Sequence, residues 1–133
     1  MVASAGGQFN RGNLTMQRLA LAAAFMLAGI GGAAAQNIGG YYDVYGTNIN
    51  GSEYRGTAEI RVISDTTCEI YWTTGSSTSS GICMRYGVAF AAGYVLGDAI
   101  GLVIYEIMDD GSLQGTWTIA GYDGNGTEVL TPQ

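Results

Sequence analysis

The sequence of 133 residues contains no histidine and no lysine, and it has only two cysteines and one proline. Without an imidazole, a Ser-His-Asp or Cys-His catalytic pair and a His-ligated metal site are excluded. Carboxylates for glycoside chemistry are present at Glu53, Glu59, Glu69 and Glu106, but their spacing does not separate an acid from a nucleophile. We therefore expect a protein that is not an enzyme and that uses no cofactor.

The N-terminal residues have the pattern of a secretory signal peptide. Arg18 precedes a run of twelve apolar residues, and small residues ending at Ala35 follow. The apolar run is too short to cross a bilayer, which takes about 20 helical residues, and the small residues suit signal peptidase. We expect a helical signal peptide at residues 1–35, of which the first fifteen are a candidate over-extended start. A single periplasmic or secreted domain then occupies 36–133; the alternative is a buried N-terminal helix.

Positive charge is scarce in the expected mature domain. Arg55, Arg61 and Arg85 stand against eleven Asp and Glu residues, which gives a net charge of −8. Phosphate backbones and anionic membrane surfaces need clustered Lys or Arg, so we expect no nucleic-acid partner and no stable membrane insertion. A cationic partner would be attracted, which leaves open a periplasmic inhibitor of a cationic enzyme such as lysozyme.

The two cysteines predict a disulfide if the chain is exported. Cys68 and Cys83 flank a loop predicted at 75–81, and the midpoint between them falls inside it. The bridge would therefore join the two strands of one hairpin, and a closed loop of this length contributes about 3 kcal/mol. The alternative is a pair of free thiols in a redox site, although the spacing matches no redox motif.

Past residue 36, apolar and β-branched residues alternate with polar ones in short runs that end at Gly, Asn, Asp or Ser. The pattern predicts eight strands, at 39–48, 53–64, 67–74, 81–85, 88–95, 100–108, 113–120 and 126–131. Every connection is short, so neighbouring strands should pair antiparallel. Pairing of the first strand with the last would hide both edges. We predict an all-β fold, a small antiparallel up-and-down barrel, with a two-sheet β-sandwich as the alternative.

Candidate ligand-binding residues follow from the strand alternation. It turns Trp72 and Trp117 toward the barrel interior, with Tyr94 and Tyr105 as further candidates. An eight-stranded barrel holds either packed side chains or one small ligand, so these residues line a pocket or fill a core. Arg85 shares the facing of the cysteines. It either points inward, where it needs a carboxylate or a bound anion, or is released to the rim by the following turn.

Two further patterns concern partners. The segments 88–95 and 100–108 are apolar on both faces, which predicts an outward apolar patch and makes a homo-oligomer a candidate assembly. Oxygen ligands for Ca²⁺ occur at 109–110 and 123–125. Asp-Gly and Asn-Gly form turns first, so we expect no metal site there.

A resemblance to a known family covers nearly all of residues 39–133. The segments that carry it are Tyr45–Asn48, Asn50–Ser52, Tyr54–Ile60, Thr67–Gly75, Gly81–Arg85, Ala89–Tyr94, Gly101–Tyr105, Gly115–Ile119 and Gly126–Thr131. In these the chain resembles a family of small exported proteins, common in alphaproteobacteria, that are often labelled fibronectin-binding protein. The resemblance implies a non-enzymatic protein that binds fibronectin or another extracellular matrix or surface protein, and it assigns no site residues. In topology the chain is similar to avidin-type and lipocalin-type barrels, which implies a carrier of a small apolar ligand as the alternative.

Overall fold

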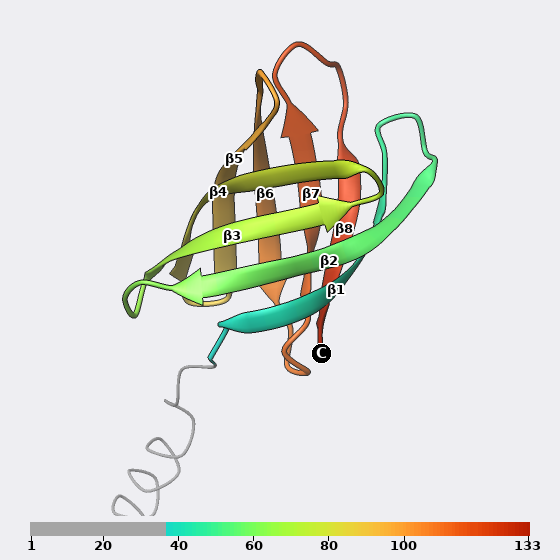
Figure 1. Cartoon of the computed structure of the whole chain (residues 1–133). Helices are drawn as coiled ribbons and strands as arrows, with labels where there is room; N and C mark the ends of the chain where they lie inside the picture. Colours follow the sequence, from blue (N-terminus) through green and yellow to red (C-terminus); the bar gives the residue numbers. More distant parts are fainter. Residues whose placement is uncertain (1–36) are drawn as a thin grey trace, which may run out of the picture. The chain divides into compact units, whose positions relative to one another are not determined.

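The computed structural model describes residues 37–133, which form one compact unit, a closed antiparallel barrel of eight strands (Figure 1). The strands are β1 (Gly40–Thr47), β2 (Glu53–Val62), β3 (Thr67–Thr74), β4 (Ser77–Tyr86), β5 (Ala89–Leu96), β6 (Ala99–Ile107), β7 (Leu113–Ile119) and β8 (Gly126–Pro132). Each strand pairs with the next along the chain, and β1 pairs with β8. The predicted up-and-down barrel is therefore confirmed, and the sandwich alternative is wrong. The predicted signal peptide lies outside the described residues.

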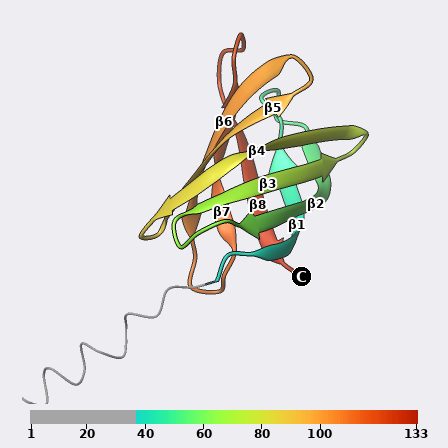
Figure 2. The ribbon, with the colours of Figure 1, turned by 60° about the vertical axis from the view of Figure 1, so that its left-hand side comes forward.

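The strands are strongly tilted, as closure of a small barrel requires. Figure 2 shows the barrel from a second side, with β3 and β4 in front running steeply across β7 and β8 behind. In the described part of the chain, no helix is long and apolar enough to cross a membrane.

The turn between β3 and β4 differs from the prediction. Thr74 pairs with Ser77, so the connection is a two-residue turn in which Gly75 has a φ of 59°. The predicted loop at 75–81 and the predicted short strand 81–85 are wrong, because β4 begins at Ser77. Its Ser and Thr residues have the composition of a loop. They lie in a strand here because its inward side faces a hollow end of the barrel, where no apolar side chain is required.

The barrel is filled at one end. This end holds the strand starts of β1, β3, β5 and β7 and both ends of the described chain. Its core is made of buried side chains from all eight strands and the segment before β1: Ile38, Tyr42, Ile60, Cys68, Cys83, Phe90, Ile107, Leu113 and Leu130. The Tyr42 hydroxyl donates to the Ile38 carbonyl oxygen at 2.6 Å, which ties the entering chain across this end. We call it the closed end.

The predicted disulfide is confirmed and lies at the closed end. Cys68 and Cys83 are bonded, both are buried, and they face each other directly in the register of β3 and β4. The bridge therefore joins the two strands of one hairpin. A disulfide suggests an oxidising, exported environment for this domain.

Candidate functional site

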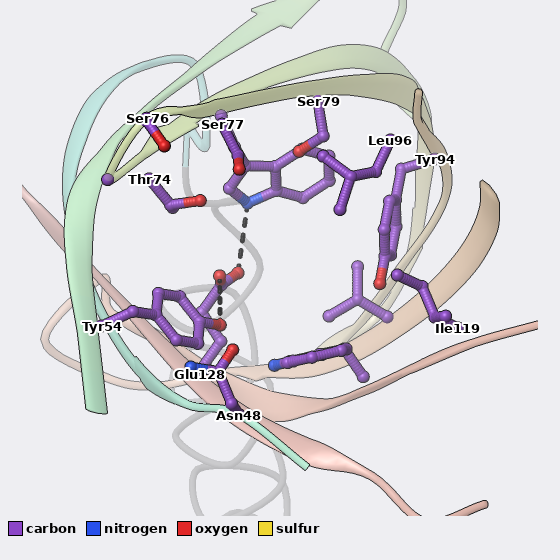
Figure 3. Close-up of a pocket in the computed structure, with 14 residues that line it drawn as sticks. Asn48, Tyr54, Thr74, Ser76, Ser77, Ser79, Tyr94, Leu96, Ile119 and Glu128 are labelled. Atoms are coloured by element: carbon purple, nitrogen blue, oxygen red, sulfur yellow. Dashed lines mark hydrogen bonds between the residues drawn. The ribbon is translucent and has the colours of Figure 1, made fainter. Parts of the chain in front are cut away.

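The opposite end of the barrel is hollow. A cavity of about 360 Å³ opens there, among the turns that connect β1 to β2, β3 to β4, β5 to β6 and β7 to β8 (Figure 3). We call this cavity the cup. Its lining residues are Asn48, Tyr54, Trp72, Thr74, Gly75, Ser76, Ser77, Ser79, Tyr94, Leu96, Val103, Trp117, Ile119 and Glu128. Its serine and threonine residues all come from the β3–β4 hairpin, and its aromatic residues come from β2, β3, β5 and β7.

A buried carboxylate forms part of the cup wall. Glu128 on β8 is only 6% exposed, because the alternation that turns Leu130 into the core also turns Glu128 inward. Its Oε1 accepts a hydrogen bond from the Tyr54 hydroxyl at 2.9 Å. Its Oε2 accepts one from Trp72 Nε1 at 3.1 Å and a short one from the Tyr105 hydroxyl. Three donors from three other strands therefore hold this carboxylate in place.

The protonation of the site is governed by burial. Burial raises the pKa of Glu128 above its ordinary value, and the three donors act in the opposite direction. Burial, and next the negative charge of Glu128, raise the pKa of Tyr54 and of Tyr105 far above the ordinary value. The same two causes raise the pKa of Tyr94 to about 12. The phenols are therefore neutral donors near neutral pH, and Glu128 alone determines the charge of the cup wall.

Four aromatic rings form the wall in two edge-to-face pairs. The centroids of Trp72 and Tyr94 are 5.4 Å apart with an interplanar angle of 62°. Those of Tyr54 and Trp117 are 6.3 Å apart at 68°. In an edge-to-face pair the ring that contributes its edge keeps both faces free of its partner. All four residues line the cup, so they present aromatic surface to a molecule inside it.

Glycines position three of these rings. Tyr54 lies opposite Gly46, Tyr94 opposite Gly101 and Trp117 opposite Gly126 in the barrel register. At each of these glycines an added Cβ would lie within 2.1 to 2.4 Å of the ring of its partner. Each ring therefore lies flat across the space that a side chain on the neighbouring strand would fill, an arrangement that packs aromatic rings against glycines in β-sheets.

One polar group of the wall lacks a hydrogen bond. Trp117 Nε1 is buried and makes no hydrogen bond of acceptable geometry within the described chain. The indole N–H of Trp117 lies near the Tyr54 hydroxyl and acts to lower the pKa of that phenol, but the effect is minor beside that of burial. A buried N–H donor of this kind is costly, and an acceptor on a bound molecule would satisfy it.

The structure brings together three of the five residues that the sequence proposed as ligand-binding. Trp72, Trp117 and Tyr94 all line the cup. Tyr105 is fully buried, does not line the cup, and meets it through its hydrogen bond to Glu128. Arg85 lies at the closed end, where its Nη2 donates to the Gly87 carbonyl oxygen at 3.4 Å.

Tyr54 and Glu128 were missed as site residues. Tyr54 is in phase with the buried Ala58 and Ile60 of its strand, so the alternation of the sequence carried a signal for it. The segment 126–131 carries the same signal, because its Leu130 is an obvious core residue and Glu128 lies two positions before it. Among residues 37–133, no group of three or more His, Cys, Asp and Glu side chains could hold a metal ion.

A second hollow lies on the outer surface. Ala91 and Gly93 on β5 form its floor, between Ile82 and Met84 of β4 on one side and Leu102 and Ile104 of β6 on the other. These four large side chains are 56 to 75% exposed. We call this apolar hollow, of about 750 Å³, the outer trough.

Comparisons with known proteins concern the fold alone. No family model and no curated protein matches the sequence. A redesigned beta barrel superposes with a TM-score of 0.62 at 17% identity, covering 72% of this chain and 91% of that chain. The redesigned barrels mFAP1 and mFAP0, both bound to DFHBI, give TM-scores of 0.61 and 0.60 at 18% and 20% identity. They cover 71% and 72% of this chain and 94% and 99% of their own. The chain thus has the fold of small β-barrels, some of which bind small molecules.

Proposed function

We propose that this protein is a non-enzymatic barrel that binds and carries a small molecule in the cup. The observation that carries the proposal is the contrast between the two ends, because the closed end is packed with apolar side chains while the other end holds a cavity of about 360 Å³. Ligand sites in proteins are cavities of about 300 to 1,000 Å³, mostly apolar, with a few convergent polar groups. The cup has aromatic walls, one buried carboxylate and one unpaired indole N–H.

The solved barrels support the same function. Two of them, mFAP1 and mFAP0, are bound to the small molecule DFHBI. The chemistry of the cup also suits binding better than turnover. The titratable groups that line it are one carboxylate and two phenols, and the pKa of each phenol is raised, so the cup lining offers Glu128 no partner for general acid-base catalysis near neutral pH.

Tryptophan fluorescence offers a direct test. Both tryptophans of the protein, Trp72 and Trp117, line the cup, so a bound molecule affects the whole tryptophan signal. We expect the neutral dye N-phenyl-1-naphthylamine to bind saturably and to receive energy from the tryptophans. We also expect protein purified from its source to retain a small molecule in native mass spectrometry.

A pair of neighbouring residues on β4 provides the control. Ser79 lines the cup, whereas Ser80 belongs to the opposite, outward alternation of the same strand. Ser79→Leu should weaken dye binding by filling the cavity, and Ser80→Leu should not. Equal dye binding by both variants, or no saturable binding to the wild type, would overturn the proposed function.

A second candidate is a protein-binding function, and the outer trough favours it. An exposed apolar surface of this kind marks interaction sites on soluble proteins. Fibronectin is the partner implied by the sequence resemblance. Surface plasmon resonance of residues 37–133 on immobilised fibronectin should then give saturable binding at micromolar concentration that Leu102→Asp abolishes. An inhibitor of a cationic enzyme would instead bind lysozyme with an affinity that falls steeply as salt is added.

A further inference from the structure

The cup contains an acidic group whose neighbours include no cation. The contacts that determine the protonation of Glu128 are burial and three neutral donors, from two phenols and one indole. No Arg is present among the residues that line the cup. A negative charge in this place is stabilised by hydrogen bonds but not by an opposite charge, which is an expensive arrangement for a buried group.

The carboxylate retains one free acceptor position. An ionised carboxylate has about four lone-pair sites. Oε2 accepts from Trp72 and Tyr105, while Oε1 accepts from Tyr54 alone. Since Glu128 lines the cup, a donor on a bound molecule can occupy the remaining site on Oε1.

The aromatic wall favours positive charge as well. Trp72, Tyr94, Tyr54 and Trp117 all line the same cavity, and the rings of Tyr54 and Tyr94 are labelled in Figure 3. The face of an aromatic ring is electrostatically negative and attracts organic cations, most strongly where water is excluded. The net charge of −8 on residues 36–133 adds a long-range attraction of the same sign.

We infer that the ligand of the cup is an organic cation, a protonated amine on an apolar or aromatic body, whose N–H donates to Glu128 Oε1 beside the aromatic wall of the cup. The inference rests on the proposed function and names the ligand class for that site. A carboxylate or phosphate ligand would meet Glu128 as a like charge. A neutral ligand would leave the carboxylate without a counter-charge.

The test uses three probes with one apolar body and different head groups: 4-phenylbutylamine, 4-phenylbutanol and 4-phenylbutanoate. Binding to the wild-type protein is measured by tryptophan quenching and by calorimetry at neutral pH. We expect the amine to bind about tenfold or more tighter than the alcohol, because it gains a charge-assisted hydrogen bond and cation–π contacts. The acid should bind weakest.

Two isosteric variants separate the buried carboxylate from net charge. Glu128→Gln should reduce the preference for the amine over the alcohol to less than about twofold, while binding of the alcohol persists. Glu106→Gln removes one negative charge from an exposed position on β6 and should leave the preference unchanged. The comparison of the three probes on the wild type needs no variant, so it holds even if Glu128→Gln folds poorly.

Acidification gives a second readout. The titratable groups that face Glu128 are Tyr54 from β2, Tyr105 from β6 and Tyr94 from β5, and all three stay protonated because their pKa values are raised. As pH falls, Glu128 takes up a proton, so amine affinity should fall while alcohol affinity stays constant. Alcohol or acid binding as tightly as the amine would overturn the ligand class and leave the proposed function standing. Failure of all three probes in a protein that binds N-phenyl-1-naphthylamine would also overturn the ligand class, and failure of the dye as well would overturn the proposed function itself.

Discussion

At the scale of single residues, Glu128 occupies a position where a small domain gains most stability from an apolar side chain. Its neighbours along the inner side of β8 are Gly126 and the fully buried Leu130. A carboxylate in this place loses its hydration, and replacing such groups by apolar ones often stabilises a protein. The proposed ligand-binding function would account for a group that the packing of the barrel does not need.

The buried carboxylate makes stability depend on pH in a defined direction. Burial raises the pKa of Glu128 in the folded state above 4.5, so the unfolded chain loses this proton first as pH rises. The free energy of unfolding of the wild type should then fall relative to Glu128→Gln above about pH 4.5, by up to about 1.4 kcal/mol per pH unit, until the folded-state pKa is passed. Urea denaturation of both proteins between pH 4 and pH 8 measures this difference.

The exposed variant Glu106→Gln is the control for that series. Glu106 lies in solvent on β6, so this variant measures what the loss of one exposed negative charge does to the free energy of unfolding over the same range. A Glu128→Gln difference that stays constant with pH, or that grows in favour of the wild type with rising pH, would contradict a raised pKa of Glu128.

Sequence alternation explains which site residues were predictable. Trp72 and Trp117 are large, apolar and in phase with core residues, so their inward facing could be predicted and is confirmed. Glu128 is equally in phase, but an acidic residue is usually assigned to solvent, and its three donors lie 23 to 74 residues away in sequence. Only the closure of the barrel brings these donors to it. For Arg85, alternation was not enough to predict a place in the site. It lies near the end of β4, at the closed end of the barrel and away from the cup.

At the scale of elements, the β5–β6 hairpin holds Tyr94 in the cup wall through Gly101. The three atoms nearest to a Cβ added at Gly101 all belong to the Tyr94 side chain, at 2.1 to 2.5 Å, and none belongs to backbone. Gly101→Ala should therefore displace the ring, break the bond from its hydroxyl to the Thr118 carbonyl oxygen, and leave the strands paired. We expect binding of N-phenyl-1-naphthylamine to weaken by about tenfold.

The same hairpin supplies a matched substitution. A Cβ added at Gly93 meets only Leu102 Cδ2, at 3.8 Å, which is ordinary contact distance. Gly93→Ala should keep the dye affinity of the wild type, and circular dichroism should show a β spectrum for both variants. Wild-type dye affinity in Gly101→Ala would exclude Tyr94 from the binding wall.

The disulfide stabilises the β3–β4 hairpin. Cys68 and Cys83 are separated by 15 residues, and a closed loop of that length contributes about 3 kcal/mol through the unfolded chain. The double variant Cys68→Ala/Cys83→Ala should lose about this much in urea denaturation, with some further loss from the two small cavities at the closed end. Dithiothreitol should destabilise the wild type and leave the double variant unaffected. Indifference of the wild type to the reductant would show that the bridge adds nothing to stability.

The limits of sequence prediction for elements are clear in this hairpin. The midpoint of the cysteines correctly located the turn, because antiparallel partners lie at equal distances from it. The extent of β4 was wrong because Ser77 and Ser79 face the cup, and strand prediction relies on apolar residues facing a filled core. The polar start of β4 is therefore itself a sign of the cavity.

At the scale of the whole molecule, the barrel has two different outer faces. The faces of β1, β2 and β3 carry most of the charged strand residues, including the ion pair between Arg61 and Glu59 at 2.7 Å. The outer trough on β4, β5 and β6 is apolar. Because the sheet is closed, no strand edge is free for pairing with another chain. A partner must therefore cover the trough face to face.

In the purified domain, where no other protein partner is present, we expect a second copy of the domain to cover the trough, as a symmetric dimer. Leu102 and Ile104 form a ridge beside the floor of Ala91 and Gly93, so a ridge of one copy can enter the trough of the other, while the charged strands β1 and β2 of both copies stay apart. In sedimentation velocity, residues 37–133 should shift from monomer to dimer with rising concentration. Leu102→Asp should raise the dissociation constant by more than about tenfold, because the interface would bury an unpaired carboxylate. Thr57→Asp adds the same charge on the exposed face of β2 and should not, and a monomeric wild type at all concentrations would exclude the dimer.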